Sequence, residues 1–92
     1  MRVKVLFTGL MKHYAGEKEK VYELPEGAKV SDLMLLVGRE YGSRLPDGMW
    51  DAEKERFHHT IVATRKGSRA VNRDDPLKPG DEIYVLSRMA GG

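Results

Sequence analysis

A change of hydrophobic period near residue 30 is the feature that most limits the fold of this chain. Apolar residues recur from there at helical spacing, forming one stripe that contains Val30, Leu33, Met34, Val37 and Tyr41. The segments on both sides alternate in polarity or are rich in β-branched residues, as strands are. A helix between strand-forming segments predicts an α+β domain in which the helix packs on a sheet.

The predicted strands are residues 2–8, 18–24, 57–65 and 83–86, with a short return strand at 70–71. The first two are expected to form a hairpin. Alternation within these strands places every second side chain on the same face, so one face of the sheet should be buried under the helix and the other exposed.

Glycines and prolines mark the predicted connections. Residues 10–16 are the expected loop of the hairpin, and turns are expected at Pro25-Glu26-Gly27, Pro46-Asp47-Gly48 and Pro79-Gly80. Gly42 is well placed to end the helix. Gly38 lies inside the helix, where glycine costs about 1 kcal/mol relative to alanine. Close packing on the sheet would explain its presence.

The size and charge of the chain exclude several classes of function. Its 92 residues are enough for one small domain. The formal charge of +2 comes from scattered side chains, so nothing indicates a nucleic-acid surface. The longest apolar run, Leu33–Val37, is too short to cross a membrane. A soluble cytoplasmic protein, monomeric on its own, is therefore expected.

The side chains that could carry chemistry are few. The chain has no cysteine, which excludes a thiolate nucleophile, a disulfide or a cysteine-ligated metal. His58 and His59 are adjacent, and on a strand they would point to opposite faces and could not easily share a metal ion. The acidic pairs Asp74-Asp75 and Asp81-Glu82 lie in proline-containing loops, where such residues are usual. We expect no bound metal or cofactor.

The last two residues, Gly91 and Gly92, suggest a function for the carboxyl end. Without a Cβ, a glycine backbone can enter a narrow channel, so the terminal carboxylate could be delivered into the active site of another protein. The alternative is a frayed terminus, which is common. Residues 87–92 form the predicted flexible tail, which would reach about 20 Å when extended.

Four short motifs occur in a characteristic order: Lys4-Val5-Leu6-Phe7, Leu24-Pro25-Glu26-Gly27-Ala28-Lys29-Val30, Pro76-Leu77-Lys78-Pro79-Gly80-Asp81-Glu82-Ile83 and Ala90-Gly91-Gly92. Together they resemble the MoaD/ThiS sulfur-carrier family of ubiquitin-like β-grasp proteins over nearly the whole chain. The resemblance implies one β-grasp domain over residues 1–92, with a mixed sheet of four to five strands packed on one main helix.

The resemblance also implies a carrier that is not itself an enzyme. In the family, a separate ubiquitin-activating-type adenylating enzyme uses ATP to join the terminal carboxylate, here that of Gly92, to AMP. A sulfur donor then displaces AMP, and the thiocarboxylate goes to an acceptor such as the large subunit of molybdopterin synthase. The chemistry agrees, because a carboxylate at neutral pH is a poor electrophile until activated, and the chain has no phosphate loop.

Three alternatives to molybdopterin synthesis stay open. The chain could be a ubiquitin-like modifier conjugated to lysines, because its Arg88-containing tail is similar to the end of ubiquitin. It could carry sulfur for thiamine or cysteine synthesis. It could also be a β-grasp interaction module whose final glycines are incidental.

The predicted docking surface is the sheet face opposite the helix. Alternation places four residues there, namely Leu6, Thr8, Tyr84 and Leu86. Arg88 and Met89 are predicted to be read by the partner as well. Ser87-Arg88 stands where the family often has two prolines, which leaves the identity of the partner open. The segment 43–59 is longer than compact members need, and is either a neutral insertion or a specificity loop.

Overall fold

The computed structural model describes residues 1–66 and 70–88. Its elements follow the order β1 (Arg2–Phe7), α1 (Gly9–Ala15), β2 (Glu19–Glu23), α2 (Val30–Tyr41), the 3-10 helix η1 (Gly42–Arg44), β3 (Trp50–Asp51), β4 (Arg56–Phe57), β5 (Ile61–Arg65) and β6 (Glu82–Ser87). The predicted tail residues Met89, Gly91 and Gly92 lie outside the described part of the chain.

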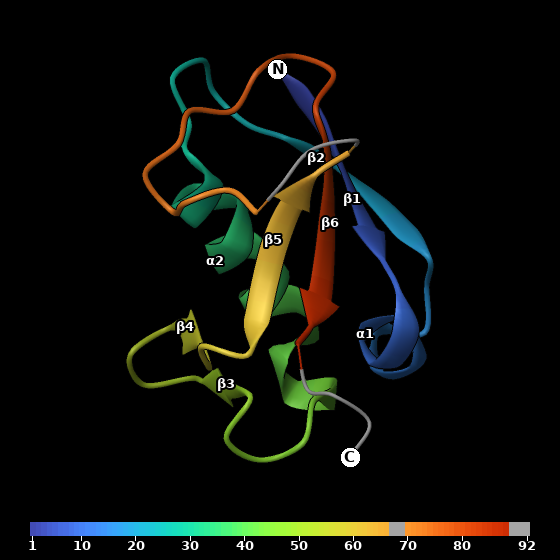
Figure 1. Ribbon diagram of the computed structural model, residues 1–92. Coiled ribbons are helices and arrows are strands. Elements are labelled where there is room, and N and C mark those ends of the chain that lie inside the picture. The colour runs from blue at the N-terminus through green and yellow to red at the C-terminus, as the bar shows by residue number, and fades with distance from the viewer. Residues whose placement is uncertain (67–69, 89–92) are drawn as a thin grey trace.

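The main sheet has four strands in the order β2-β1-β6-β5. The two central strands, β1 and β6, are parallel, and each pairs with an antiparallel strand at the edge. Figure 1 shows α2 packed across one face of this sheet and the small β3–β4 hairpin near the start of β5. The expected α+β architecture, a mixed sheet with one main helix, is confirmed.

The core lies between α2 and the facing side of the sheet. Alternate residues of β1 and β6 point into it, and so does one stripe of α2. The fully buried members of this set are Val3, Val5, Leu33, Val37, Tyr41, Ile83 and Val85. The helical stripe and the strand alternation that predicted the fold are therefore the same residues that hold its layers together.

All three predicted turns form, and each uses a glycine for the same reason. The residues Gly27, Gly48 and Gly80 have φ values of 88°, 89° and 82°. Each is the third residue of a turn closed by a backbone hydrogen bond, such as the 3.0 Å bond from Asp81 N to Lys78 O. A type II turn requires positive φ at this position, and glycine adopts it without steric strain.

The predicted hairpin loop is wrong, because residues 9–15 form the helix α1. Met11 and Ala15 are buried on one side of this helix, while Gly16 ends it in the left-handed conformation with φ of 75°. Only these two residues at i and i+4 show the helical period. This apolar stripe is too short to indicate a helix against the flanking glycines, which favour a loop.

The partner of Gly38 also differs from the prediction. A Cβ at Gly38 would lie 2.1 Å from Trp50 Cζ3, and one at Gly42 would lie 2.2 Å from Trp50 Cδ1. The indole of Trp50, and not the sheet, therefore occupies the groove that these glycines leave on α2. Gly42 ends α2 in a right-handed conformation and leads into η1, without the left-handed cap that glycine usually supplies.

The predicted strand 57–65 is two strands separated by a turn. β4 ends at Phe57, and β5 begins at Ile61, whose N–H donates to His58 O at 2.9 Å. His58 and His59 are therefore not on a strand. Their rings lie together, with centroids 4.1 Å apart, which corrects the prediction of opposite faces. The predicted return strand is reduced to one bridge between Thr64 and Ala70.

Candidate functional site: an outer sheet face at the root of the tail

The strand that leads to the tail is held in the middle of the sheet. β6 pairs with β1 on one side and β5 on the other. The side chains of Ile83 and Val85 are fully buried, and they fix which residues of β6 point outward. Tyr84 and Leu86 therefore lie on the face opposite α2, next to their register partners Leu6 and Val62.

The outer sheet face, defined here as Leu6, Val62, Tyr84 and Leu86, is apolar and half-buried. Its neighbours toward the β2 edge include Val21, whose exposed fraction is 43%. Adjacent apolar side chains on the open side of a sheet are the usual centre of a protein interface.

Charged residues surround this apolar centre, and they pair with one another. Arg2 Nε lies 3.0 Å from Glu23 Oε1, Lys4 Nζ lies 3.3 Å from Glu19 Oε2, and Lys66 Nζ lies 3.5 Å from Glu82 Oε2. All three pairs are exposed or half-exposed and contribute little to stability. Because each charge has a neighbour of opposite sign, the outer sheet face presents its apolar surface without a strong net field.

A turn at the start of β6 sets the direction of the strand. Asp81 accepts a hydrogen bond from Lys78 N at 2.8 Å, and Arg65 Nη2 lies 3.0 Å from the same carboxylate oxygen. Arg65 also donates to Pro76 O at 3.1 Å, which ties β5 to the connection before β6. Gly80 N donates to Arg2 O at 2.9 Å and joins the turn to β1.

The other end of β6 is the root of the tail. Arg88 N donates to Thr60 O at 2.7 Å, which continues the β5–β6 ladder one residue beyond the strand. The Arg88 side chain is exposed. Thr60 is in turn held by His58, whose Nδ1 lies 3.0 Å from Thr60 Oγ1. The backbone is therefore hydrogen-bonded to the sheet as far as Arg88, a few residues before Gly91 and Gly92 in the sequence.

The predicted docking residues divide into three groups. The structure brings Leu6, Tyr84 and Leu86 together on the outer sheet face. Thr8 does not join them, because β1 ends at Phe7 and Thr8 is the N-cap residue of α1. Arg88 lies at the root of the tail, and Met89 falls outside the described residues. Binding of a partner by these residues stays a prediction.

Sequence reasoning missed Val62, which completes the outer sheet face opposite Leu86. The missing information was the start of β5, since the alternation Ile61, Val62, Ala63 is present in the sequence. Among residues 1–66 and 70–88, no helix is long and apolar enough to span a membrane, and no three acidic or histidine side chains are grouped as metal ligands would be. Every buried side chain in that part of the chain is apolar.

Solved structures with the same fold come from archaea and a eukaryote. SAMP1 of Haloferax volcanii superposes with a TM-score of 0.81 at 16% identity, covering 100% of both chains. A putative molybdopterin converting factor, subunit 1, of Pyrococcus furiosus gives 0.72 at 28% identity, covering 95% of this chain and 97% of the other. Urm1 of Trypanosoma brucei gives 0.72 at 20%, covering 99% and 95%.

No match was found among curated proteins. The family described as the ThiS family matches residues 5–92, which is nearly the whole chain. This match includes the second half of β1, the strands β2, β5 and β6, both α-helices and the terminal glycines. The chain therefore belongs to the ThiS family and has the β-grasp fold of ubiquitin-like sulfur carriers.

Proposed function

We propose that this protein carries sulfur as a thiocarboxylate on Gly92 for the synthesis of molybdopterin. The terminal carboxylate attacks the α-phosphate of ATP on a separate adenylating enzyme, which gives an acyl-adenylate and pyrophosphate. A sulfur donor then attacks the activated carbonyl and releases AMP. The observation that carries the proposal is the central strand β6, whose hydrogen bonds continue as far as Arg88 beside an apolar outer sheet face.

The choice of molybdopterin rests on the 28% identity to the putative molybdopterin converting factor, subunit 1, of Pyrococcus furiosus. In this proposal the protein supplies no catalytic side chain. The adenylating enzyme holds ATP, and the acceptor is the large subunit of a molybdopterin synthase. The described residues position the tail, and the outer sheet face docks on each partner in turn.

The first test is the mass of the intact protein after incubation with a cognate adenylating enzyme, ATP and a sulfur source. We expect the mass to rise by the difference between one sulfur and one oxygen atom. Deletion of Gly92 should abolish the exchange, although it leaves the described fold untouched. An unchanged mass of the full chain after incubation with its cognate enzyme would contradict the proposal.

The second test separates the outer sheet face from the rest of the surface. Leu86→Asp should slow adenylation at least about tenfold, because it places a charge in the apolar centre of the docking face. Leu36→Asp is the matched control, since it makes the same change at a half-buried leucine on α2, across the sheet from this face. Circular dichroism checks that both variants are folded. Equal rates for the two variants would exclude this face.

A role as a protein modifier is the second candidate, and Arg88 before the tail favours it. Conjugation would join the Gly92 carbonyl to a lysine amine through the same acyl-adenylate. Tagged protein expressed in its own cells should then give larger species that resist denaturant and disappear when Gly92 is deleted. Sulfur exchange without such species would leave the carrier role alone.

A further inference from the structure

A second surface with a different character lies on the α2 side of the molecule. A groove of about 540 Å³ runs between α2, the β3–β4 hairpin and the start of β5. Its apolar floor includes Met34, Leu35, Trp50, Phe57 and Ile61. It shares no residue with the outer sheet face, which lies across the sheet from α2. We call it the hairpin groove.

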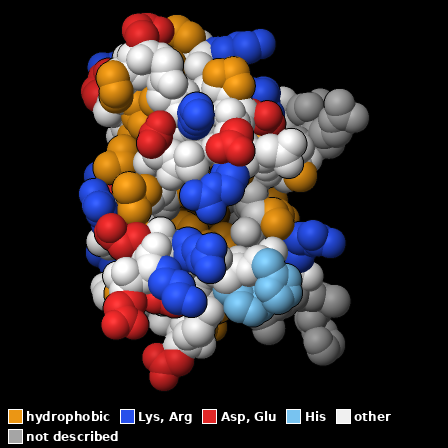
Figure 2. All heavy atoms as spheres, turned by 90° about the vertical axis from the view of Figure 1, so that its left-hand side faces the viewer, with side chains coloured by type: hydrophobic (Ala, Val, Ile, Leu, Met, Phe, Trp, Pro, Cys, Tyr) orange, Lys and Arg blue, Asp and Glu red, His pale blue; other side chains and the backbone are white. Residues whose placement is uncertain are grey.

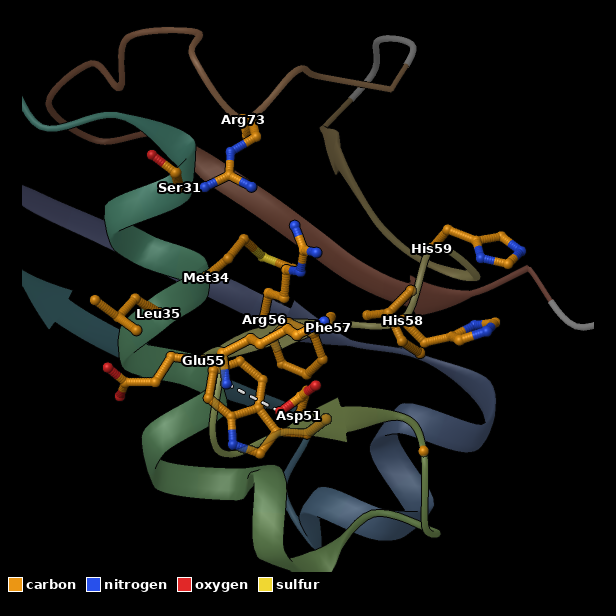
Figure 3. A pocket seen from close by; sticks show the side chains of 14 residues that line it. Ser31, Met34, Leu35, Asp51, Glu55, Arg56, Phe57, His58, His59 and Arg73 are labelled. Carbon is orange, nitrogen blue, oxygen red and sulfur yellow. Dashed lines mark hydrogen bonds between the residues drawn. The ribbon is translucent and has the colours of Figure 1, made fainter.

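Cationic side chains gather along the rim of the hairpin groove. They are Lys54, Arg56 and Arg73, all exposed. Figure 2 shows Lys and Arg side chains over the middle of this side of the molecule, beside an apolar hollow with the histidines next to it. In Figure 3, Arg73 and Arg56 extend toward each other near Met34, so both guanidinium groups lie over the same part of the groove.

These three cations lie together on one rim and form no salt bridge with another described residue. Within residues 1–66 and 70–88, none has a carboxylate oxygen within 4.0 Å, whereas six other basic side chains do.

The acidic side chains of the groove are already engaged. Asp51 accepts backbone hydrogen bonds from Lys54 at 2.9 Å and Glu53 at 3.0 Å, and the Lys54 bond contributes most to lowering the Asp51 pKa. Glu55 accepts two bonds from Arg39, at 2.6 and 3.0 Å. The charge of Glu55 is thus balanced by Arg39, while Asp51 keeps its charge and interacts with Lys54 and Arg56. Three cations against this one carboxylate leave the rim with a net positive charge.

The wall of the groove is fixed before any ligand arrives. Trp50 fills the space above Gly38 and Gly42, and its ring lies 4.8 Å from that of Phe57. A groove whose wall is already packed lowers the entropy cost of binding. We propose that the hairpin groove binds an acidic segment of a partner protein, whose apolar side chains lie on the floor and whose carboxylates pair with Arg56 and Arg73.

Two other ligand classes fit less well. A small molecule needs a few enclosed polar groups to fix its orientation, but no polar side chain is buried in the described part of the chain. A single-stranded nucleic acid needs accessible aromatic faces and a continuous basic track. Here Trp50 is committed to α2 and Phe57, and the three rim cations form a short cluster and not a continuous track.

The protein carries its own reporter for this proposal, because Trp50 is its only tryptophan. The probe is a short capped peptide that alternates glutamate with leucine, titrated while Trp50 fluorescence and amide NMR shifts are recorded. We expect saturation below about 1 mM, shifts confined to α2 and residues 50–59, and weaker binding at high salt. A peptide that alternates lysine with leucine should not bind.

Two charge-matched variants decide where the peptide binds. Arg56→Glu with Arg73→Glu should weaken binding at least about tenfold. Lys12→Glu with Lys18→Glu changes the net charge equally but lies outside the groove, and should change affinity less than about twofold. Equal losses in both variants, absence of saturation, or tighter binding of a thymidine oligonucleotide at the same residues would overturn the proposal.

The test is independent of sulfur transfer. A chain that lacks Gly91 and Gly92 should bind the peptide as well as the full chain does, although it cannot be adenylated at Gly92. Failure of the peptide test therefore leaves the proposed function standing. Failure of the mass test likewise leaves the hairpin groove standing.

Discussion

The two flanks of α2 are held to the rest of the molecule by different contacts. On the β2 side, Glu40 accepts a hydrogen bond from Tyr22 at 2.8 Å and lies 3.2 Å from Lys20 Nζ. On the other side, the β3–β4 hairpin spans the gap through Trp50, and within residues 1–66 and 70–88 the rim cations of the hairpin groove have no carboxylate oxygen within 4.0 Å. One flank is sealed by polar contacts, while the other is held by an aromatic ring beside an open groove.

The contrast separates contacts that hold the fold together from charges that are left for a partner. The polar contacts of the β2 flank join elements that the β-grasp sheet already places side by side. The hairpin has no strand pairing to the main sheet, so its position depends on how well Trp50 fits α2.

The largest effect is expected for Gly38→Ala. Alanine improves helix propensity by about 1 kcal/mol, but its Cβ would lie 2.1 Å from the indole, and the ring would have to leave its position. Overpacking and lost burial outweigh the gain, so we expect a net loss of about 2 kcal/mol in the free energy of unfolding, measured with urea.

The control for this prediction is the same substitution in a background without the indole, where its effect on stability should change sign. In a Trp50→Ala background the clash is gone, so Gly38→Ala should stabilise the protein by about 1 kcal/mol. A destabilising effect in both backgrounds would mean that Gly38 is needed for some other contact, and that the hairpin is not seated by its indole.

The same pair of residues shows where sequence reasoning stopped. The stripe of α2 and the three turns were predicted because each depends on neighbours within a few residues. The packing of Trp50 against Gly38 and Gly42 was not predicted, because these residues have no regular spacing in the chain. Helix α1 was missed for a related reason: only Met11 and Ala15 of its seven residues are buried.

The residues of the candidate site likewise divide into those that the sequence predicts and those that only the folded chain brings together. Strand alternation was enough to place Leu6, Tyr84 and Leu86 on one face, because register within a strand is local. Thr8 was misplaced by one residue at a strand end, which is where assignments are least certain. The groove cations come from the hairpin and from the connection before β6, and only the folded chain brings them together.

A smaller effect is expected on the β2 flank for Tyr22→Phe. The hydrogen bond from Tyr22 is the main cause that lowers the Glu40 pKa, with Lys20 contributing less. Since the Glu40 side chain is 37% exposed, we expect a loss of only about 0.5–1 kcal/mol at pH 7. The groove should be unaffected, which peptide binding would check.

The pH dependence gives this prediction its sign. A carboxylate with a lowered pKa stabilises the fold above its unfolded pKa, and that stability is lost as the pH falls through the folded value. The difference between the native protein and Tyr22→Phe should therefore be constant near neutral pH and shrink below about pH 4.3. Glu40→Gln should remove this dependence. A difference that grows in acid would contradict the assignment.

The smallest effect should come from the polar contact of the other flank, the ion pair between Arg39 and Glu55. The two side chains are 56% and 40% exposed, and water screens their attraction. Glu55→Gln should therefore lower the urea midpoint far less than Gly38→Ala does, and the loss should vanish in an Arg39→Gln background. If the ion pair rather than the indole held the hairpin, this order would be reversed. The hairpin groove would then open at high salt, and peptide binding would be lost along with the stability. With Trp50 as the anchor, salt weakens the contacts of the peptide but leaves the groove itself intact.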